Sequence, residues 1–402
     1  MNSKENLNKN YTKLEKGELN NVYTKRIHSI DFLKGVAIYI IILINTAEIW
    51  INKESRFVYA IIYLYLDVIG TSLFIFLFSL SVIFLWKKKM GISPSKEIRN
   101  DILTRGLILI ILGIGYNIIS TSITLNMPLP LNLWGWNILI FIGFAQIISY
   151  YAVKLSRGAR WIIGFLFFFA STPIRELLIL GKNTNQIVSI LHFIIISPNP
   201  QTTILPYIAL CFFSTIFGER LLECLQLDAK VCNLETFHTL IIFGFIFLFI
   251  GISYGYGLVT PEILDPEDYP MIKLIPILET QSFFPLSKVP GYLIRGTAPN
   301  LLYGLGVALI ILGCTFYLLD ILYVQNAIIK MFDFYGKVSL SLFFIHCVGL
   351  LFFIQQLTIV VFFIAYFFYI GFLGLLMYLW FRYAKGVGTL KWLISKTSSR
   401  HK

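Results

Sequence analysis

Four polar side chains interrupt the first long apolar stretch of the sequence, and their spacing brings them to one side of a helix. They are Asp31, Lys34, Asn45 and Glu48, separated by steps of 3, 11 and 3 positions. At about 100° per residue, these steps place all four within roughly a 100° stripe. Lys34 would lie near one end of the helix, with Asn45 about 16 Å further along. Each polar group in such an apolar helix needs a partner, a cavity or a function.

One interpretation of this stripe is purely structural. Asp31 and Lys34 would anchor the helix at a membrane interface. Asn45 would make an interhelical hydrogen bond, and Glu48 would be exposed at the opposite mouth. The spacing alone favours neither this interpretation nor a functional one.

Two more polar side chains lie inside later apolar stretches. Asp67 has Thr71 one turn on along the same face, and a carboxylate at this depth is protonated, partnered or functional. His346 has Ser339 seven residues earlier on the same face. We expect it to line a helix interface or a cavity. For both residues a packing role and a chemical role stay open.

Composition identifies the class of protein that must position these side chains. Hydrophobic residues make up 57% of the 402 positions and charged residues 13%, with a mean hydropathy of +0.76. These values disfavour a soluble fold. The net charge of +12 comes from short Lys and Arg clusters between apolar runs, which is typical of cytoplasmic loops rather than of nucleic-acid binding. The five cysteines show no CxxC spacing, so neither a metal site nor a disulfide framework is predicted.

Ten apolar runs are each long enough to cross a hydrocarbon layer of about 30 Å. They are 32–50, 58–86, 102–120, 133–153, 161–181, 203–218, 236–254, 299–324, 338–357 and 358–383. The run from Ile187 to Ile196 is too short and stops at a turn-forming Ser-Pro-Asn-Pro stretch, which predicts a re-entrant or half helix. The expected fold is therefore all-α, a polytopic transmembrane helical bundle with about ten spanning helices.

Loop charges predict the orientation of this bundle. Basic clusters follow the second, fourth and last runs, whereas the loop 255–298 is acidic. Its acidic residues include Glu262, Asp265, Glu267 and Asp268. With ten crossings, the positive-inside rule places both termini in the cytoplasm, and we expect the membrane to be the plasma membrane.

The opening of the first run resembles a known family. Ser29-Ile-Asp31-Phe-Leu-Lys34-Gly35, followed by an apolar run to Asn45, is similar to the start of the heparan-α-glucosaminide N-acetyltransferase-like membrane acyltransferases. These usually read S-x-D-x-x-R-G and end the helix in Asn. In the related acyltransferase family 3 group, the same spacing separates an arginine from a histidine.

Further stretches resemble the family in the same order. Asp67 opens a segment similar to D-x-x-x-x-x-F-x-F-x-x-G, with Phe74, Phe76 and Ser79 each one position late. Other matching stretches are Trp136 to Gly143, Pro206 with Gly218, Phe334 to His346, and Gly388 to Trp392. The resemblance spans roughly residues 29–392. We therefore expect a transmembrane acyltransferase-like domain at 29–392, between a disordered cytoplasmic tail 1–28 and a second cytoplasmic tail 393–402.

Two departures from the family pattern concern its chemistry. The family arginine is Lys34 here, which keeps the charge but loses the bidentate fork. The histidine that animal lysosomal members place in the loop after the first helix is missing, because residues 46–66 contain none. If the chemistry needs a base there, another group must supply it.

The resemblance implies a membrane-embedded O- or N-acyltransferase in the lipid bilayer. Acetyl-CoA or another acyl-CoA would be a co-substrate from the cytoplasmic side, with no permanently bound cofactor, and Lys34 and Arg105 would bind its phosphates. The acceptor would be a hydroxyl or amine of a glycan or lipid-linked sugar at the outer face. A homodimer is compatible with the sequence.

The catalytic roles that the resemblance implies leave the base open. Asn45 would orient the acceptor or stabilise the developing oxyanion. Glu48, Asp67 or His346 would act as the base. Two alternatives also stay open: a transporter or flippase for a lipid-linked glycan that uses the polar stripe as a pathway, and a catalytically silent relative that lacks the loop histidine.

Overall fold

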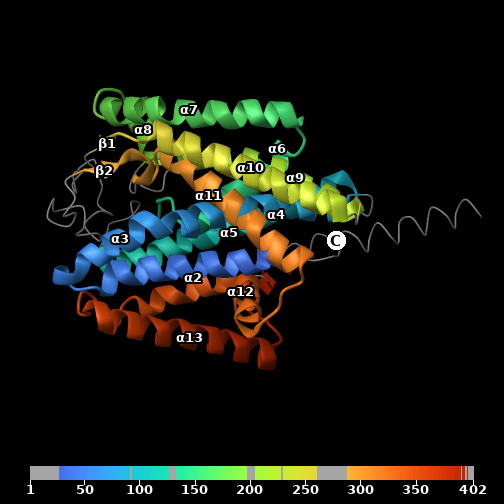
Figure 1. The fold of residues 1–402 in the computed structure, drawn as a ribbon. Helices are drawn as coiled ribbons and strands as arrows, with labels where there is room; N and C mark the ends of the chain where they lie inside the picture. The colour runs from blue at the N-terminus through green and yellow to red at the C-terminus, as the bar shows by residue number, and fades with distance from the viewer. Residues whose placement is uncertain are drawn as a thin grey trace, which may run out of the picture.

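The computed structural model describes residues 27–90, 93–125, 133–196, 204–227, 230–259, 288–390, 392–393 and 396. These residues are mainly helical (Figure 1). The helices are α2 (His28–Trp50), α3 (Arg56–Asp67), α4 (Leu73–Lys89), α5 (Ser95–Leu125), α6 (Ile138–Ala152), α7 (Arg157–Gly181), α8 (Gln186–Ile195), α9 (Ile204–Leu227), α10 (Lys230–Tyr254), α11 (Ala298–Phe316), α12 (Ala327–Gly349) and α13 (Ile359–Ala384). Two short strands, β1 (Leu258–Val259) and β2 (Val289–Pro290), pair antiparallel before α11.

Each of the ten predicted apolar runs overlaps a helix or a continuous helical stretch. The second run is α3 and α4 joined by the π turn η2 (Val68–Ser72). Among the described residues, eight helices are long and apolar enough to cross a membrane. The other two are α6, with 15 residues, and α12, which carries Lys330, Asp333 and Lys337 in its first half. The predicted polytopic helical bundle is confirmed, and the predicted short segment is the 10-residue α8.

The last residues of the run 338–357 lie outside its helix. The run 338–357 predicts a helix through its last residue, but α12 ends at Gly349. The following segment turns back over the end of α2, where the Gln355 N–H donates to the Ile49 carbonyl (2.7 Å) and the Leu357 N–H to the Trp50 carbonyl (2.9 Å). Hydropathy does not predict this end, because the residues remain apolar while their backbone pairs with a distant part of the chain.

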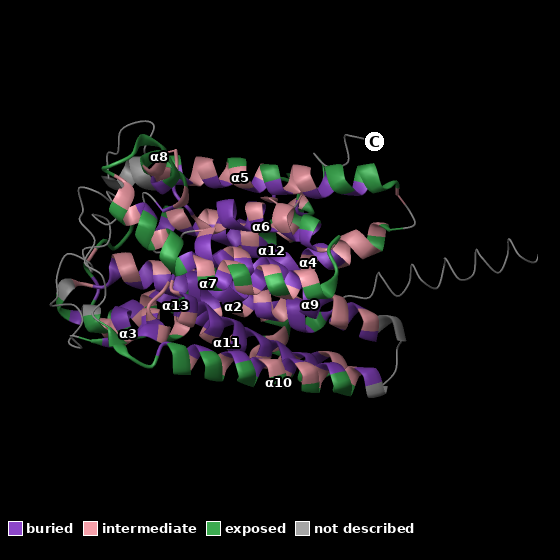
Figure 2. Ribbon diagram, turned by 90° about the horizontal axis from the view of Figure 1, so that it is seen from above, coloured by how far each residue is buried: buried purple, intermediate pink, exposed green. Residues whose placement is uncertain are grey.

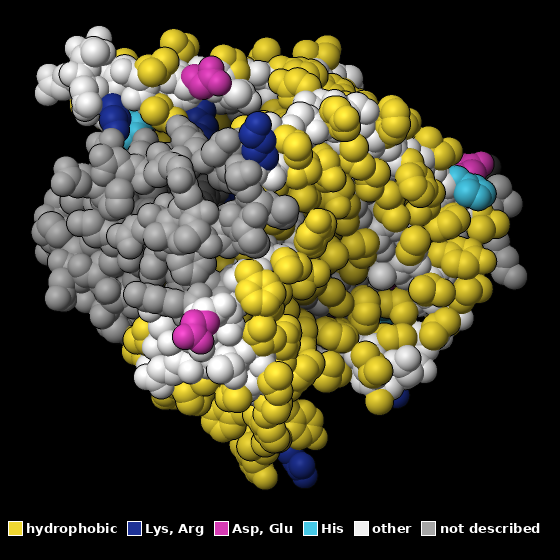
Figure 3. Space-filling model, turned by 60° about the vertical axis from the view of Figure 1, so that its left-hand side comes forward, with side chains coloured by type: hydrophobic (Ala, Val, Ile, Leu, Met, Phe, Trp, Pro, Cys, Tyr) yellow, Lys and Arg dark blue, Asp and Glu magenta, His cyan; other side chains and the backbone are white. Residues whose placement is uncertain are grey.

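Burial distinguishes central from peripheral helices (Figure 2). In the apolar windows, 72% of α2 and 78% of the α3–α4 stretch are buried inside the protein, against 22% for α7 and 28% for α10 and α13. Large apolar side chains such as Phe169, Phe249 and Phe368 are exposed on these peripheral helices. Hydrophobic side chains also cover much of the face shown in Figure 3. An apolar exterior around a partly polar centre is expected of an integral membrane protein.

The start of α2 and the end of α13 lie at the same end of the described bundle (Figure 1); we define this as the inner end and the opposite one as the outer end. Their cytoplasmic and extracellular assignment stays a prediction. The acidic residues predicted to mark the outer loop lie outside the described residues, as does most of both predicted tails; these acidic residues are Glu262, Asp265, Glu267 and Asp268.

Two glycines bring α2 and α12 into backbone contact. A methyl group added to Gly336 would lie 1.7 Å from the Asp31 carbonyl oxygen, and one added to Gly35 would lie 2.0 Å from the Phe332 carbonyl oxygen. Small residues permit such close crossings between membrane helices. This contact sets the register of α12 along α2, and with it the neighbours of every polar residue further along the two helices.

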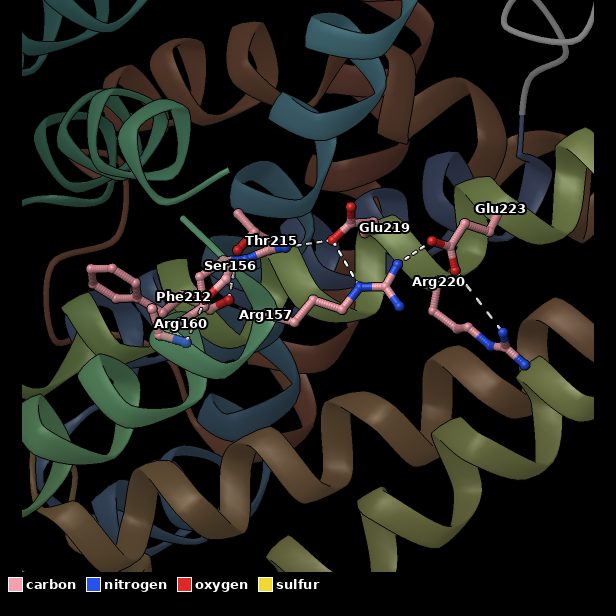
Figure 4. Close-up of polar contacts among 9 residues, drawn as sticks. Ser156, Arg157, Arg160, Phe212, Thr215, Glu219, Arg220 and Glu223 are labelled. Atoms are coloured by element: carbon pink, nitrogen blue, oxygen red, sulfur yellow. Dashed lines mark hydrogen bonds and ion pairs between the residues drawn. The ribbon is translucent and has the colours of Figure 1, made fainter. Parts of the chain in front are cut away.

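An ion-pair network joins α7 to α9 (Figure 4) and extends from α9 to α10. Its members are Arg157, Arg160, Arg220, Glu219, Glu223 and Glu235. Arg160 is 2% exposed and pairs with Glu219, while two of its guanidinium nitrogens have no hydrogen-bond partner among the described residues. The Glu219 carboxylate is therefore the main group that compensates the buried positive charge of Arg160.

This arrangement predicts unequal effects of two similar substitutions. Glu219→Gln should lower the free energy of unfolding by about 3–5 kcal/mol, because it leaves a buried guanidinium uncompensated. Glu235→Gln also breaks an ion pair, with Arg220 at 3.0 Å, but the Glu235 side chain is 59% exposed, so we expect a loss of about 0–1 kcal/mol. Thermal unfolding in one detergent compares the two variants. Equal losses would contradict the role given to Glu219.

Candidate active site

The first polar contact at the outer end joins α2 to α12. The Asn45 side-chain nitrogen lies 3.1 Å from Nε2 of His346. The other ring nitrogen, Nδ1, bonds to the Phe343 carbonyl oxygen of its own helix. A carbonyl only accepts, so Nδ1 carries the proton and Nε2 accepts from the Asn45 amide. The two contacts thus select one neutral tautomer of His346, whose Nε2 is oriented toward α2.

His346 is fully buried, whereas Asn45 is half-buried. Aromatic residues from other elements enclose the histidine. Tyr369 of α13 donates to the His346 carbonyl (2.7 Å), and Tyr116 of α5 stacks on Phe343 with ring centroids 5.2 Å apart. The ring therefore lies in a largely apolar environment and contacts Asn45 through Nε2.

A second polar cluster surrounds Asp67, at the end of α3. Its Oδ2 lies 3.3 Å from Nε of Arg295, and its Oδ1 accepts a hydrogen bond from the Thr71 hydroxyl (2.8 Å). Thr71 in turn accepts from Nη2 of Arg295 (3.3 Å). Burial opposes the charge of Arg295, but the Asp67 carboxylate together with Tyr63 and Tyr207 outweighs burial, so the pKa of Arg295 lies well above its ordinary value. Asp67 is thus a partnered carboxylate.

The π turn η2 explains one departure from the family pattern. Phe74, Phe76 and Ser79 lie one position late relative to Asp67, and the π turn falls between Asp67 and Phe74. A π turn takes up one residue more than an α-helical turn. The extra residue is therefore absorbed locally, and the helix continues beyond it without a change of face.

The two clusters lie at similar depth. A methyl group added to Gly70 of η2 would lie 3.3 Å from the side chains of Ile40 and Ile41 on α2. Because α2 and the α3–α4 stretch run in opposite directions, Asp67, three residues before Gly70, falls near the level of Asn45. Glu48 lies at this end as well and interacts electrostatically with Tyr59 of α3 and Tyr116 of α5.

The predicted cation sites lie toward the inner end and have different partners. Lys34 donates to the Ser81 hydroxyl of α4 (2.6 Å) and lies 4.5 Å from the centre of the Phe78 ring. Arg105 pairs with Asp101 one turn earlier on α5, with Nε 3.0 Å from Oδ1. Along one face of α2, Lys34 thus contacts α4 and Asn45 contacts α12, while Arg105 belongs to another network.

Sequence reasoning did not identify Arg295. It is one of three basic residues in the acidic loop 255–298, and it precedes the apolar run of α11. A buried carboxylate requires a cation or a proton, so Asp67 was the available signal that such a partner exists. The sequence does not show which of the three basic residues is the partner of Asp67, because this depends on how the loop packs back against the bundle.

The fold and the site describe a polytopic membrane protein with a polar, histidine-containing centre inside the outer half of its bundle. The family model for heparan-alpha-glucosaminide N-acetyltransferase, catalytic, matches residues 26–255, and the chain belongs to this family. Membership indicates a membrane acetyltransferase-like function. The match contains Asn45, Glu48 and Asp67 but neither Arg295 nor His346. No curated protein matches the chain.

Proposed function

We propose that this protein transfers an acetyl or other acyl group from acyl-CoA on the cytoplasmic side to a hydroxyl or amine of a glycan or lipid-linked sugar at the outer face of the plasma membrane. The contact between Asn45 and His346 supports this proposal most directly. It places a neutral imidazole with a defined acceptor nitrogen beside the asparagine that the family pattern puts at the end of its first helix.

In the proposed reaction His346 is the general base. The acceptor hydroxyl or amine attacks the thioester carbonyl carbon and loses its proton to Nε2 of His346. The carbon–sulfur bond then breaks, and the departing CoA sulfur recovers the proton. Asn45, released from Nε2 when the acceptor binds there, donates its amide hydrogen to the carbonyl oxygen on which negative charge develops. His346 would thereby take the place of the missing loop histidine.

Lys34 supports binding of the donor. Its ammonium lies on the same face of α2 as Asn45, toward the inner end, where it can attract a phosphate of acyl-CoA. The 11 positions between these two residues correspond to about 16 Å along the helix. The pantetheine arm would have to cover this length for the thioester to reach Asn45, which fits a donor that enters from the inner end.

Donor binding provides the first test. Acetyl-CoA at 100 times its Kd should stabilise the purified protein against thermal unfolding by about 2.7 kcal/mol. Lys34→Gln should reduce the shift at a fixed donor concentration. Lys154→Gln removes a cation that lies over the Tyr150 ring at the end of α6 and should leave the shift intact.

Turnover provides the decisive test of the proposal. Release of free CoA from acetyl-CoA, measured with a thiol reagent, should depend on added sugar acceptors, and mass analysis should find the acetylated acceptor. Absence of any thermal shift at millimolar acetyl-CoA, together with absence of CoA release in folded protein, would contradict the acyltransferase and favour the transporter alternative.

A further inference from the structure

We propose that Asp67 and Arg295 are a positioning pair that holds the π turn η2 against α2 below Asn45, rather than a proton-transfer site. This inference rests on the function proposed above, because it assigns a role within the same site. Arg295 would be needed as long as Asp67 carries its charge, although it lies outside the matched family segment.

The contacts of Asp67 favour positioning over proton transfer. Thr71 donates to one of its carboxylate oxygens, and Arg295 lies 3.3 Å from the other. A general base needs a lone pair that is directed at the substrate and a ready affinity for a proton. Each oxygen of the Asp67 carboxylate thus already has a partner within the protein, which fits a positioning role. His346 has no such cationic partner among its described contacts.

The same contacts bridge the π turn. Asp67 immediately precedes η2 and Thr71 lies within it, so the guanidinium of Arg295 binds both ends of this irregular segment. π turns in helices occur frequently at functional sites. Here Gly70 of the π turn packs against Ile40 and Ile41 of α2, about one helical turn before Asn45. Displacement of the turn would therefore move or rotate the helix that carries Asn45.

Arg295 is well placed to act as a fixed support, because the segment that carries it is itself anchored. The Thr297 side chain caps α11 and donates to the Ile294 carbonyl (2.8 Å). Asn300 donates to the Tyr292 carbonyl (2.9 Å), and Leu293 packs in a small apolar cluster with Leu64 of α3. The guanidinium also lies 5.8 Å from the centre of the Tyr63 ring. This segment thus joins α11 to α3 at the level of the π turn.

A double-mutant cycle tests the pair. Arg295→Met leaves a buried carboxylate without its cation and Asp67→Asn leaves a buried guanidinium without its anion, so each single variant should lose stability and lower kcat by about 10- to 100-fold. In the double variant no buried charge is left uncompensated, and the amide oxygen introduced by Asp67→Asn can still accept from Thr71. We expect it to fold and to recover kcat to within about tenfold of the original protein, since removal of both partners of a buried pair is often tolerated.

The pH profile distinguishes positioning from proton transfer. If Asp67 and Arg295 only position the π turn, the pH dependence of kcat in the double variant should be unchanged and acetyl-CoA affinity retained. If Asp67 is the base, the double variant should remain as inactive as Asp67→Asn, about 10²- to 10⁴-fold below the original, and this result would overturn the proposal. Arg382→Met alters an exposed arginine on α13. It should change neither the pH dependence of kcat nor the affinity for acetyl-CoA.

Thermal unfolding of the same four proteins separates this proposal from the function on which it rests. Strong coupling between positions 67 and 295 in stability supports the pair whether or not acyl transfer is detected. If the original protein transfers no acyl group but the coupling is present, the proposed function is contradicted while the Asp67–Arg295 pair is still supported. Additive effects on stability, with no recovery in the double variant, would overturn the pair.

Discussion

His346→Ala should lower acceptor-dependent turnover of acyl-CoA by about 10²- to 10⁴-fold, the contribution of a positioned general base. Donor binding should be retained, because His346 lies at the outer end while Lys34 lies toward the inner end. The measurement is CoA release under saturating donor, together with the thermal shift caused by acetyl-CoA. A fully buried imidazole with one tautomer selected by two contacts is well suited to this role.

Asn45→Ala should lower turnover by about 10²- to 10³-fold, the loss seen for one oxyanion donor, again with little change in donor affinity. Because Asn45 and His346 act as a unit, the double variant should lose far less than the product of the two single losses. Cys347→Ala changes the neighbouring residue of α12, which is half-buried, and should leave turnover nearly unchanged. Near-normal turnover of folded, donor-binding Asn45→Ala would show that the active site lies elsewhere.

The remaining candidate bases are tested in the same assay. Glu48→Gln and Asp67→Asn each remove one carboxylate at nearly constant shape. The pH profile of the residual activity should change only when the true base is removed. A changed profile in Glu48→Gln, with an unchanged profile in His346→Ala, would transfer the role of base to Glu48.

Gly336→Ala should have a large effect on the fold. A methyl group at this position would lie 1.7 Å from the Asp31 carbonyl oxygen, so the backbones of α2 and α12 must separate. Overpacking of well-packed interiors usually costs about 1–3 kcal/mol. We expect a loss at or above the upper end of this range, because the obstacle is backbone rather than a flexible side chain. Turnover should fall too, since the same two helices hold Asn45 beside His346.

Gly371→Ala is the matched control for this substitution. Gly371 lies on the exposed face of α13, and a methyl group there would meet nothing within 4 Å. Because alanine favours helix over glycine by about 1 kcal/mol, this variant should be as stable as the original or slightly more so. Thermal unfolding and the yield of folded protein compare the two. A Gly336→Ala variant as stable as Gly371→Ala would refute the close crossing of α2 and α12.

Several features follow from the sequence because they depend on local pattern. Hydropathy over windows of about 20 residues identified the apolar helices, and the short run at 187–196 was recognised as too short to span. The 3.6-residue period predicts that Lys34 and Asn45 share a face of α2, and in the structure Lys34 contacts α4 and Asn45 contacts α12. The family resemblance was also readable from motifs near the chain's beginning.

Other features were decided by contacts between distant parts of the chain. Asn45 and His346 are 301 positions apart, and only the glycine crossing of α2 and α12 brings them to the same level. Asp67 revealed a need for a partner but not its identity, because Arg295 reaches it through the return of a long loop. The early end of α12 likewise depends on pairing with the end of α2. Hydropathy and helical period describe which face of a helix is polar, whereas tertiary packing decides which two faces meet.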